Sequence, residues 1–275
     1  MKSRFAFRKQ KKIEATSQHN KPYLGLAQQI IGYSDIILEI LDARFIQDTR
    51  NFEIENLVKT NNKKIIYVLN KSDLIDVNKT KKEIELHNLY PYVFVSCKLR
   101  KGSKQLRDRI KILAKNIDTT YKRVQVGVVG YPNTGKSSVI NMLVGRDCAK
   151  TAFEAGFTKG IQMIRLTENI VILDTPGIVP ATEAVVEKTD LAKHVRIGAR
   201  NFDKVHDPEI IVQKLMEKYP DIFEKFYGIE AQGDSDILIE ELGKKKKLLK
   251  KGGLVDVDRT ARFILRDWQR GFIKV

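Results

Sequence analysis

The order of three short motifs constrains the fold of this chain more than any other feature of its sequence. Asn70–Asp73 (NKSD) comes first, Gly130–Ser137 (GYPNTGKS) follows, and Asp174–Gly177 (DTPG) comes last. Where such motifs serve one parallel sheet, the glycine-containing segment ordinarily stands first and the Asn-Lys-x-Asp segment last. All parts are present here at the right relative spacing, so the ring of elements has been cut at a different place. The sequence therefore predicts a circularly permuted fold.

Gly130–Ser137 matches the eight-residue pattern of a phosphate-binding loop, between the apolar run Val124–Val129 and a helix predicted over 136–144. Glycines let the backbone approach phosphate oxygens, and the helix N-terminus points at the β-phosphate. We expect Lys136 to bridge the β- and γ-phosphates and Ser137 to bind magnesium. A chance glycine-rich turn is the alternative that the flanking strand and helix disfavour. The predicted nucleotide contacts here are Tyr131, Pro132, Asn133, Thr134, Gly135, Lys136, Ser137 and Ser138.

Asp174–Gly177 follows a run of four apolar residues, which predicts a strand tip that holds Asp174 near the metal ion. Gly177 has no side chain, so its amide can approach the γ-phosphate. Between the two motifs, Thr158 lies where a mobile switch is expected and is a second candidate ligand for magnesium, although a lone loop threonine is usually a turn residue. The predicted catalytic residues in these motifs are Lys136, Thr158 and Gly177.

The choice of base depends on Asn70–Asp73. The carboxylate of Asp73 can accept hydrogen bonds from both N1–H and the 2-amino group of guanine, whereas adenine would leave this acceptor unpaired. This disfavours a kinase or ATPase that uses adenine nucleotides. We expect the alkyl stem of Lys71 to lie along the base and the Cys97 amide, in the segment Ser96–Lys98, to contact the guanine oxygen. The predicted base-binding residues are Asn70, Lys71, Ser72, Asp73, Ser96, Cys97 and Lys98.

Short apolar runs that alternate with helical patterns predict an α/β fold with a six-stranded, mainly parallel sheet. Beyond Pro180 the pattern becomes helical, which predicts a circularly permuted nucleotide-binding domain over 1–185 and a small all-helical domain over 186–275. The predicted strands are 35–42, 64–69, 92–96, 124–129, 161–166 and 170–173. The predicted helices are 22–33, 78–87, 103–117 and 136–144, then 187–198, 208–218, 220–227, 235–250 and 257–270.

The net charge of +16 points to a polyanionic partner, nucleic acid rather than membrane. No apolar run approaches the ~18 residues of a membrane span. Cys97 and Cys148 show no metal-ligand spacing, so we expect reduced thiols and a cytoplasmic protein. In the last predicted helix, capped by Asp256, four arginines at intervals of three and four form a basic stripe that suits an RNA backbone, or else a solvated helix face. The stripe comprises Arg259, Arg262, Arg266 and Arg270.

The motif order, together with Asp42–Arg44 (DAR), Arg50-Asn51 and the tail segment Lys250–Gly253 (KKGG), resembles the YlqF/YawG-type circularly permuted GTPases of ribosome biogenesis. The resemblance covers most of the chain. It implies a monomeric GTPase that binds GTP or GDP with magnesium, and that assists assembly of the large ribosomal subunit or its precursor through rRNA. A nucleotide-gated switch that acts on another RNA, such as tRNA, is the alternative.

The resemblance also implies roles for three further residues. Asn133 matches an asparagine that coordinates potassium beside the phosphates in related GTPases, where the cation can substitute for an arginine finger; a loop-capping amide is the alternative. Ile178 stands where other GTPases place a water-orienting glutamine, so we expect slow hydrolysis without a partner. His19 is the candidate for this task, although its flanks differ from those of the family and a solvent-exposed loop histidine is equally compatible.

Overall fold

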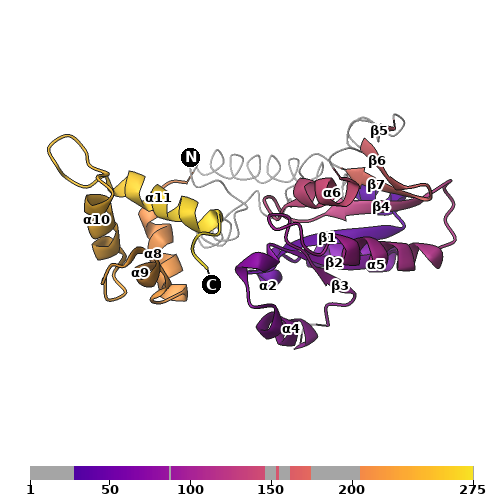
Figure 1. Cartoon of the computed structure of the whole chain (residues 1–275), viewed down its shortest axis with the longest axis horizontal. Coiled ribbons are helices and arrows are strands. Elements are labelled where there is room, and N and C mark those ends of the chain that lie inside the picture. The colour runs from indigo at the N-terminus through magenta and orange to yellow at the C-terminus, as the bar shows by residue number, and fades with distance from the viewer. Residues whose placement is uncertain (1–27, 87, 146–152, 155–161, 175–204, 275) are drawn as a thin grey trace, which may run out of the picture. The chain divides into compact units, whose positions relative to one another are not determined.

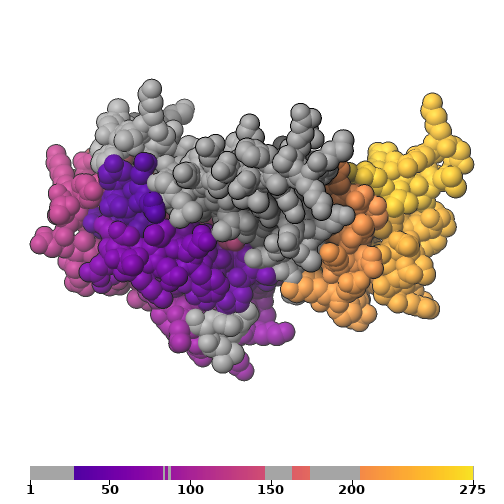
Figure 2. Space-filling view, turned by 180° about the vertical axis from the view of Figure 1, so that it is seen from behind, coloured from indigo at the N-terminus to yellow at the C-terminus, as the bar shows by residue number. Residues whose placement is uncertain are grey.

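The computed structural model describes residues 28–86, 88–145, 153–154, 162–174 and 205–274 (Figure 1). The chain divides into two compact units. Unit 1 comprises Met1–Asp73 and Val77–Val186, and unit 2 comprises Leu74–Asp76 and Glu187–Val275. In the space-filling view of Figure 2, unit 1 runs from indigo to magenta and unit 2 from orange to yellow. The predicted helix over 187–198 lies outside the described residues.

Unit 1 is built on a seven-stranded sheet in the order β3-β2-β1-β4-β7-β6-β5. Strands β3, β2, β1, β4 and β7 are mutually parallel, and β6 and β5 are antiparallel to their neighbours. The six predicted strands are confirmed, and the additional β5 has only two residues, too few to leave a pattern in the sequence. The strands are β1 Ile36–Asp42, β2 Lys64–Asn70, β3 Tyr92–Phe94, β4 Val124–Val129, β5 Phe153–Glu154, β6 Gln162–Thr167 and β7 Ile170–Asp174.

The position of β1 at the centre of the sheet reflects the permuted order of the chain. Strand β1, the first along the chain, pairs in parallel with β2 on one side and with β4 on the other. Parallel strands end at the same edge of a sheet, where open α/β sheets bind their ligands. The segments that follow β2 and β4, which carry the NKSD and phosphate-loop motifs, therefore meet at one edge although they are far apart in the sequence.

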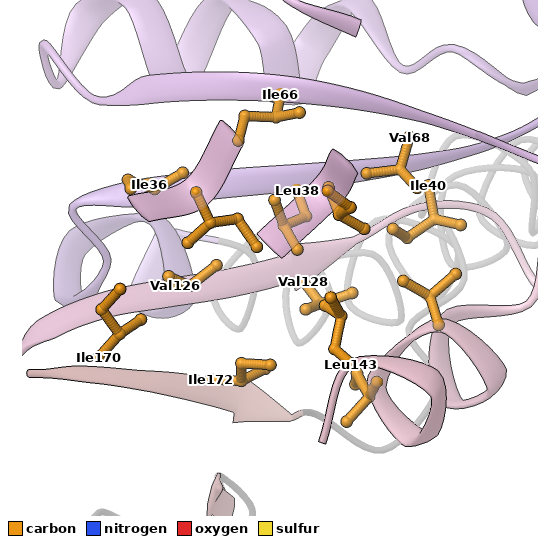
Figure 3. Close-up of a cluster of buried hydrophobic side chains, with 14 of the residues drawn as sticks. Ile36, Leu38, Ile40, Ile66, Val68, Val126, Val128, Leu143, Ile170 and Ile172 are labelled. Atoms are coloured by element: carbon orange, nitrogen blue, oxygen red, sulfur yellow. The ribbon is translucent and has the colours of Figure 1, made fainter. Parts of the chain in front are cut away.

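Helices cover both faces of this sheet. One face buries β1 residues Ile36, Leu38 and Ile40 beneath α5 (Ser103–Lys115) and α6 (Lys136–Val144), as Figure 3 shows in part. The other face buries Ile37 beneath the helical residues 28–33 and α3 (Phe52–Thr60). Because successive side chains of a strand point to opposite faces, a strand covered on both faces is mostly apolar, and five of the seven residues of β1 are Ile or Leu. This explains why β1 is fully buried along its length.

Two helices of unit 1 were not predicted, α2 (Ile46–Thr49) and α3. The sequence does contain a signal for α3, because the side chain of Asn51 accepts hydrogen bonds from the amides of Glu53 and Ile54. Ile54 and Val58, four positions apart, then form its buried face. A short 3-10 turn, η1 (Ser72–Leu74), and α4 (Val77–Leu86) follow β2.

Unit 2 is helical in its described part. Its helices are α8 Pro208–Lys218, α9 Ile222–Tyr227, α10 Ser235–Lys245 and α11 Val257–Gln269. Trp268 of α11 is fully buried, and its ring centroid lies 5.4 Å from that of Phe223 and 5.2 Å from that of Tyr219. Asp256, the predicted cap of α11, accepts from the Arg259 amide, whereas Asp207 stands at the N-cap position of α8 without a side-chain hydrogen bond.

The predicted helix over 235–250 was too long, since α10 ends at Lys245. Lys247 has a φ of 56°, and the Leu248 amide bonds to the Gly243 carbonyl, which closes the helix. The chain then reverses through Gly252 and Gly253, both at positive φ, so that Leu249 and Val255 form an antiparallel bridge. None of the helices within the described ranges is long and apolar enough to cross a membrane.

Candidate nucleotide-binding site

The phosphate loop leaves the end of β4 and enters α6 at Lys136. Gly130 and Gly135 have φ angles of 142° and 100°, which L side chains rarely adopt. Neighbouring atoms also leave no room for a side chain at either position. A Cβ at Gly130 would lie 2.5 Å from the carbonyl oxygen of Ile40, and one at Gly135 would collide with the side-chain nitrogen of Asn70. The loop is therefore packed directly against the ends of β1 and β2.

Side chains of the loop fix its curled shape. The Lys136 ammonium donates to the carbonyl oxygens of Gly130 and Tyr131, at 2.8 and 2.6 Å. The fully buried Thr134 hydroxyl donates to the Tyr131 carbonyl at 2.8 Å. Ser137 and Ser138 are exposed in the first turn of α6. The positive end of that helix and two accessible hydroxyl groups therefore face the same region as the lysine, an arrangement suited to phosphate.

Asn70 joins the phosphate loop to the predicted base-binding segments. Its side-chain amide donates to the Thr134 carbonyl at 2.8 Å, and its side-chain oxygen accepts from the Cys97 amide at 3.4 Å. Asn70 is 3% exposed; its bond to Thr134 is buried and its bond to Cys97 is partly buried. The contact of this residue with the base stays a prediction, and the structure shows that its side chain also holds two loops together.

Asp73 is held by the segment Ser96–Lys98. The Ser96 hydroxyl donates to Asp73 Oδ1 at 2.6 Å and accepts from the Leu99 amide at 3.1 Å. Burial and the nearby Asp73 charge raise the pKa of the Cys97 thiol to about 11, so the thiol stays protonated. A hollow of about 630 Å³, a typical ligand-site size, lies between this segment and α6, and extends along α6 from Ser138 to Gly145. Its lining residues are Cys97, Lys98, Arg100, Ser138, Asn141, Met142 and Gly145.

Lys71 is tied to a carboxylate that the motif analysis did not assign. Its ammonium lies 2.7 Å from Oδ2 of Asp42, and the Arg44 guanidinium binds the same oxygen at 2.7 Å. Burial acts to raise the pKa of Asp42, but the bonds and charges of Arg44 and Lys71 outweigh it and hold that pKa below its usual value. The Asp42–Arg44 motif thus anchors the Lys71 head group, and the alkyl stem of Lys71 leads from it toward the site.

A second buried carboxyl group lies on the other face of β1. Glu39 is fully buried, and its Oε1 accepts from the Asn51 amide at 2.8 Å. Its Oε2 has no hydrogen-bond partner within the described part of the chain. Burial raises the pKa of Glu39 to about 8, offset in part by the Asn51 bond. Nearby, Arg50 binds Glu55 through two bonds of 2.7 Å, which explains structurally why Arg50 and Asn51 accompany the motifs.

Several other predicted site residues lie elsewhere on the loops and strand ends or outside the described ranges. Asp174 ends β7, in register with Gln162, and its side chain is not described. Asn133 is exposed on the phosphate loop with a φ of 60°, a conformation that asparagine tolerates. Among the residues that the structure describes, no three or more His, Cys, Asp or Glu side chains form a group that could hold a metal ion. His19, Thr158, Gly177 and Ile178 lie outside the described residues.

Known proteins resemble this chain in sequence and in fold. The family described as "50S ribosome-binding GTPase" matches residues 125–224. An uncharacterized GTP-binding protein of Methanocaldococcus jannaschii is 40% identical over 256 residues, which are 91% of this chain and 65% of the relative. Nucleolar GTP-binding protein 2 of Neurospora crassa is 34% identical over 258 residues, 89% of this chain and 40% of the relative. The chain thus spans only part of the length of these relatives.

The solved structures agree. GNP-bound YlqF from T. maritima superimposes with a TM-score of 0.62 at 28% identity, covering 87% of this chain and 90% of the other. The NKSD segment precedes the phosphate loop, yet β1, β2 and β4 bring both motifs to one edge of a parallel sheet. This permuted arrangement, the relatives and the shared fold together show that the chain belongs to the YlqF-like family of circularly permuted GTP-binding proteins.

Proposed function

We propose that this protein binds and hydrolyses GTP and assists assembly of the large ribosomal subunit. The observation that carries the nucleotide part is the bond of 2.8 Å between Asn70 and the Thr134 carbonyl. It places the segment that contains Asp73 at a defined distance from the phosphate loop. A nucleotide can therefore extend from a base at Asp73 to phosphates at Lys136.

Guanine selection rests on Asp73 and Cys97. The bond from Ser96 orients the Asp73 carboxylate, whose acceptor character matches the N1–H and 2-amino donors of guanine. The Cys97 amide makes only a long bond of 3.4 Å to Asn70, so it can share its hydrogen with the guanine oxygen, and the protonated thiol serves only as a packing group. Adenine would leave a carboxylate unpaired in this site, a mismatch that can cost ~10⁴-fold in selectivity.

The residues at the phosphate end fit a magnesium-bound nucleotide. Ser137 is exposed at the helix N-terminus, and magnesium binds through few protein oxygens plus phosphate and water. The metal supplies charge neutralisation to the phosphates. Lys136 adds the positive charge for the β- and γ-phosphates, Asn133 is the residue for potassium, and Asp174 and Thr158 complete the metal ligands. We assign the γ-phosphate contact to Gly177 and the orientation of water to His19, a partner or both.

The ribosomal part of the proposal is supported by the relatives and by charge. The family description names the 50S ribosome, and the chain carries a net charge of +16. We assign nucleotide binding to residues 1–185 and RNA contact to the basic tail of 186–275. Two arginines of the α11 stripe are already engaged, because Arg262 binds Asp258 at 2.7 Å and Arg266 lies over the Phe263 ring. Arg259 and Arg270 are exposed and carry the contact, together with Lys250 and Lys251.

The test compares the full chain in its GTP-analogue and GDP forms. We expect the GTP-analogue form to co-sediment with large-subunit particles, and those particles to raise a slow intrinsic turnover. Binding to tRNA with no effect of the particles would favour the alternative, a nucleotide-gated switch on another RNA. Equal competition by ATP and GTP would overturn the guanine assignment.

A further inference from the structure

The segment that directly follows the predicted base-binding loop is strongly basic. Between Lys98 and Lys115, lysines and arginines recur throughout, and Asp108 is the sole acidic residue. This segment comprises the loop that leads away from Cys97 and the whole of α5. Lys98 belongs to the predicted base-binding segment, and Lys98 and Arg100 line the hollow beside Cys97. The cations from Lys101 onward belong to no nucleotide motif and have no role in the site described above.

Four of the cations form one line along α5. Lys104, Arg107, Lys111 and Lys115 are spaced by three, four and four residues, so they share one side of the helix. The buried face of α5, with Leu106 and Ile110, is a different side that packs on the sheet. At 1.5 Å per residue, the line is roughly 16 Å long.

The line of cations borders three hollows that share lining residues. The hollow beside Cys97 includes Lys98 and shares Arg100 with a second hollow of about 550 Å³ along α5. That second hollow includes Lys104 and Arg107 and shares Lys111 with a third, of about 430 Å³, which reaches Lys115. We call the three neighbouring hollows the α5 groove. Together they extend from the base-binding loop along the helix, and each is lined by cations, with one acidic residue in the second, Asp108, and one in the third, Glu168.

These cations are not neutralised within the described part of the chain. No ion pair there joins Lys98, Arg100 or any cation of α5 to a carboxylate, whereas Arg262 of α11 and Lys244 of α10 are paired with acids of their own helices. Arg107 has an internal hydrogen bond, from its guanidinium to the Leu143 carbonyl, which holds its side chain against α6. Asp108 and Glu168 are the acidic residues in the lining of the α5 groove, against six cations (Lys98, Arg100, Lys104, Arg107, Lys111 and Lys115), so the groove carries a net positive charge.

We propose that the α5 groove binds the phosphate backbone of a single RNA strand. Its length and even charge suit a chain of phosphates better than one small anion. Aromatic side chains are absent between Lys98 and Lys115, so the groove offers no platform on which bases stack. Binding is therefore independent of sequence and falls steeply with salt. The proposal extends the proposed function, on whose claim of an RNA partner it rests, from the tail to the nucleotide-binding unit.

The test titrates a fluorescent oligouridylate with the full chain at saturating GDP, over a series of salt concentrations. GDP occupies the phosphate loop, so the measured RNA affinity does not include RNA bound at that loop. The variant K104Q/K111Q removes two exposed cations from the groove. We expect the slope of log affinity against log salt to fall by about 1.4, since each lost contact to a single strand contributes about 0.7. The matched control, K81Q/K82Q on α4, removes the same charge elsewhere and should keep the parental slope.

Equal slopes for the two double variants would overturn the proposal, because they would show a dependence on net charge alone. The proposal also fails if K104Q/K111Q keeps the parental RNA slope but loses ribosomal particles, since the groove would then bind protein. GTP turnover is measured in parallel and should be parental in both variants. If K104Q/K111Q shows parental GTP turnover and an unchanged RNA slope, only this inference is wrong. If the parent itself shows no GTP turnover, the proposed function is wrong.

Discussion

The side-chain amide of Asn70 donates a hydrogen bond of 2.8 Å to the backbone carbonyl of Thr134, a residue 64 positions later in the chain. The bond connects the end of β2 to the phosphate loop that follows β4. Since Asn70 also accepts from the Cys97 amide, one buried side chain sets the spacing of three loops. The base and phosphate ends of the site are thereby organised together.

Replacing Asn70 by alanine should loosen all three loops. The Thr134 carbonyl and the Cys97 amide lose their partner in a buried or partly buried place, which costs about 1–3 kcal/mol for each group left unsatisfied. We expect weaker GDP binding and a lower free energy of unfolding, measured by fluorescence titration and by urea denaturation. Asn56→Ala, at an exposed position of α3, is the control. Parental GDP affinity in Asn70→Ala would refute the bridging role.

Gly135→Ala tests the packing of the phosphate loop on β2. The new methyl group would collide with the Asn70 side chain at a φ of 100°. Gly233→Ala is a matched control, because Gly233 also has positive φ, 79°, but nothing lies within 4 Å of the position that its methyl group would take. We expect loss of nucleotide binding in the first variant and only the backbone cost of about 1 kcal/mol in the second. Similar nucleotide affinities in the two would contradict this packing.

Asp73→Asn should change the preferred base. The asparagine amide replaces one acceptor by a donor, which suits the 2-oxygen of xanthine rather than the 2-amino group of guanine. The Ser96 hydroxyl can still donate to the remaining oxygen, so the loop should keep its shape. We expect weaker GDP binding and tighter binding of xanthosine diphosphate, measured by competition. A variant that bound GDP as tightly as the parent would show that the base lies elsewhere.

Asn133→Ala should abolish a dependence of hydrolysis on potassium. Asn133 is exposed on the phosphate loop, where its amide oxygen can bind a cation beside the phosphates. The parent should hydrolyse GTP faster in potassium than in sodium, and stabilisation of charge of this kind can be worth up to ~10³–10⁵ in rate. The variant should show equal, low rates in both salts at parental GDP affinity. Equal rates of the parent in the two salts would remove the cation hypothesis.

Glu39→Gln should flatten the dependence of stability on pH. Because burial raises the pKa of Glu39 to about 8, from an ordinary 4.5, the folded protein keeps a proton that the unfolded chain loses between these values. The stability of the parent therefore falls as pH rises through this window, by an amount on the order of a few kcal/mol. Glutamine does not titrate, so the variant should gain on the parent from pH 5 to pH 8. The exposed Glu53→Gln, as control, should follow the parent in urea denaturation.

The sequence by itself determined the nucleotide motifs, the six longer strands and the permuted order. These features are local: the phosphate loop needs glycines at Gly130 and Gly135, and the apolar run of β1 reports burial on both faces. These patterns can be recognised without knowing which distant residues they contact in the folded protein. The family resemblance rested on the same short segments.

Only the tertiary structure decided the partners of the polar residues. Asn70 meets Thr134 and Lys71 meets Asp42 because β1 lies between β2 and β4. Glu39 meets the Asn51 amide because α3 begins beside β1. Local patterns do not encode that neighbour relation. The α5 groove arises in the same way, because its hollows need α5, α6 and the β6–β7 turn to be adjacent, which the folded sheet alone provides.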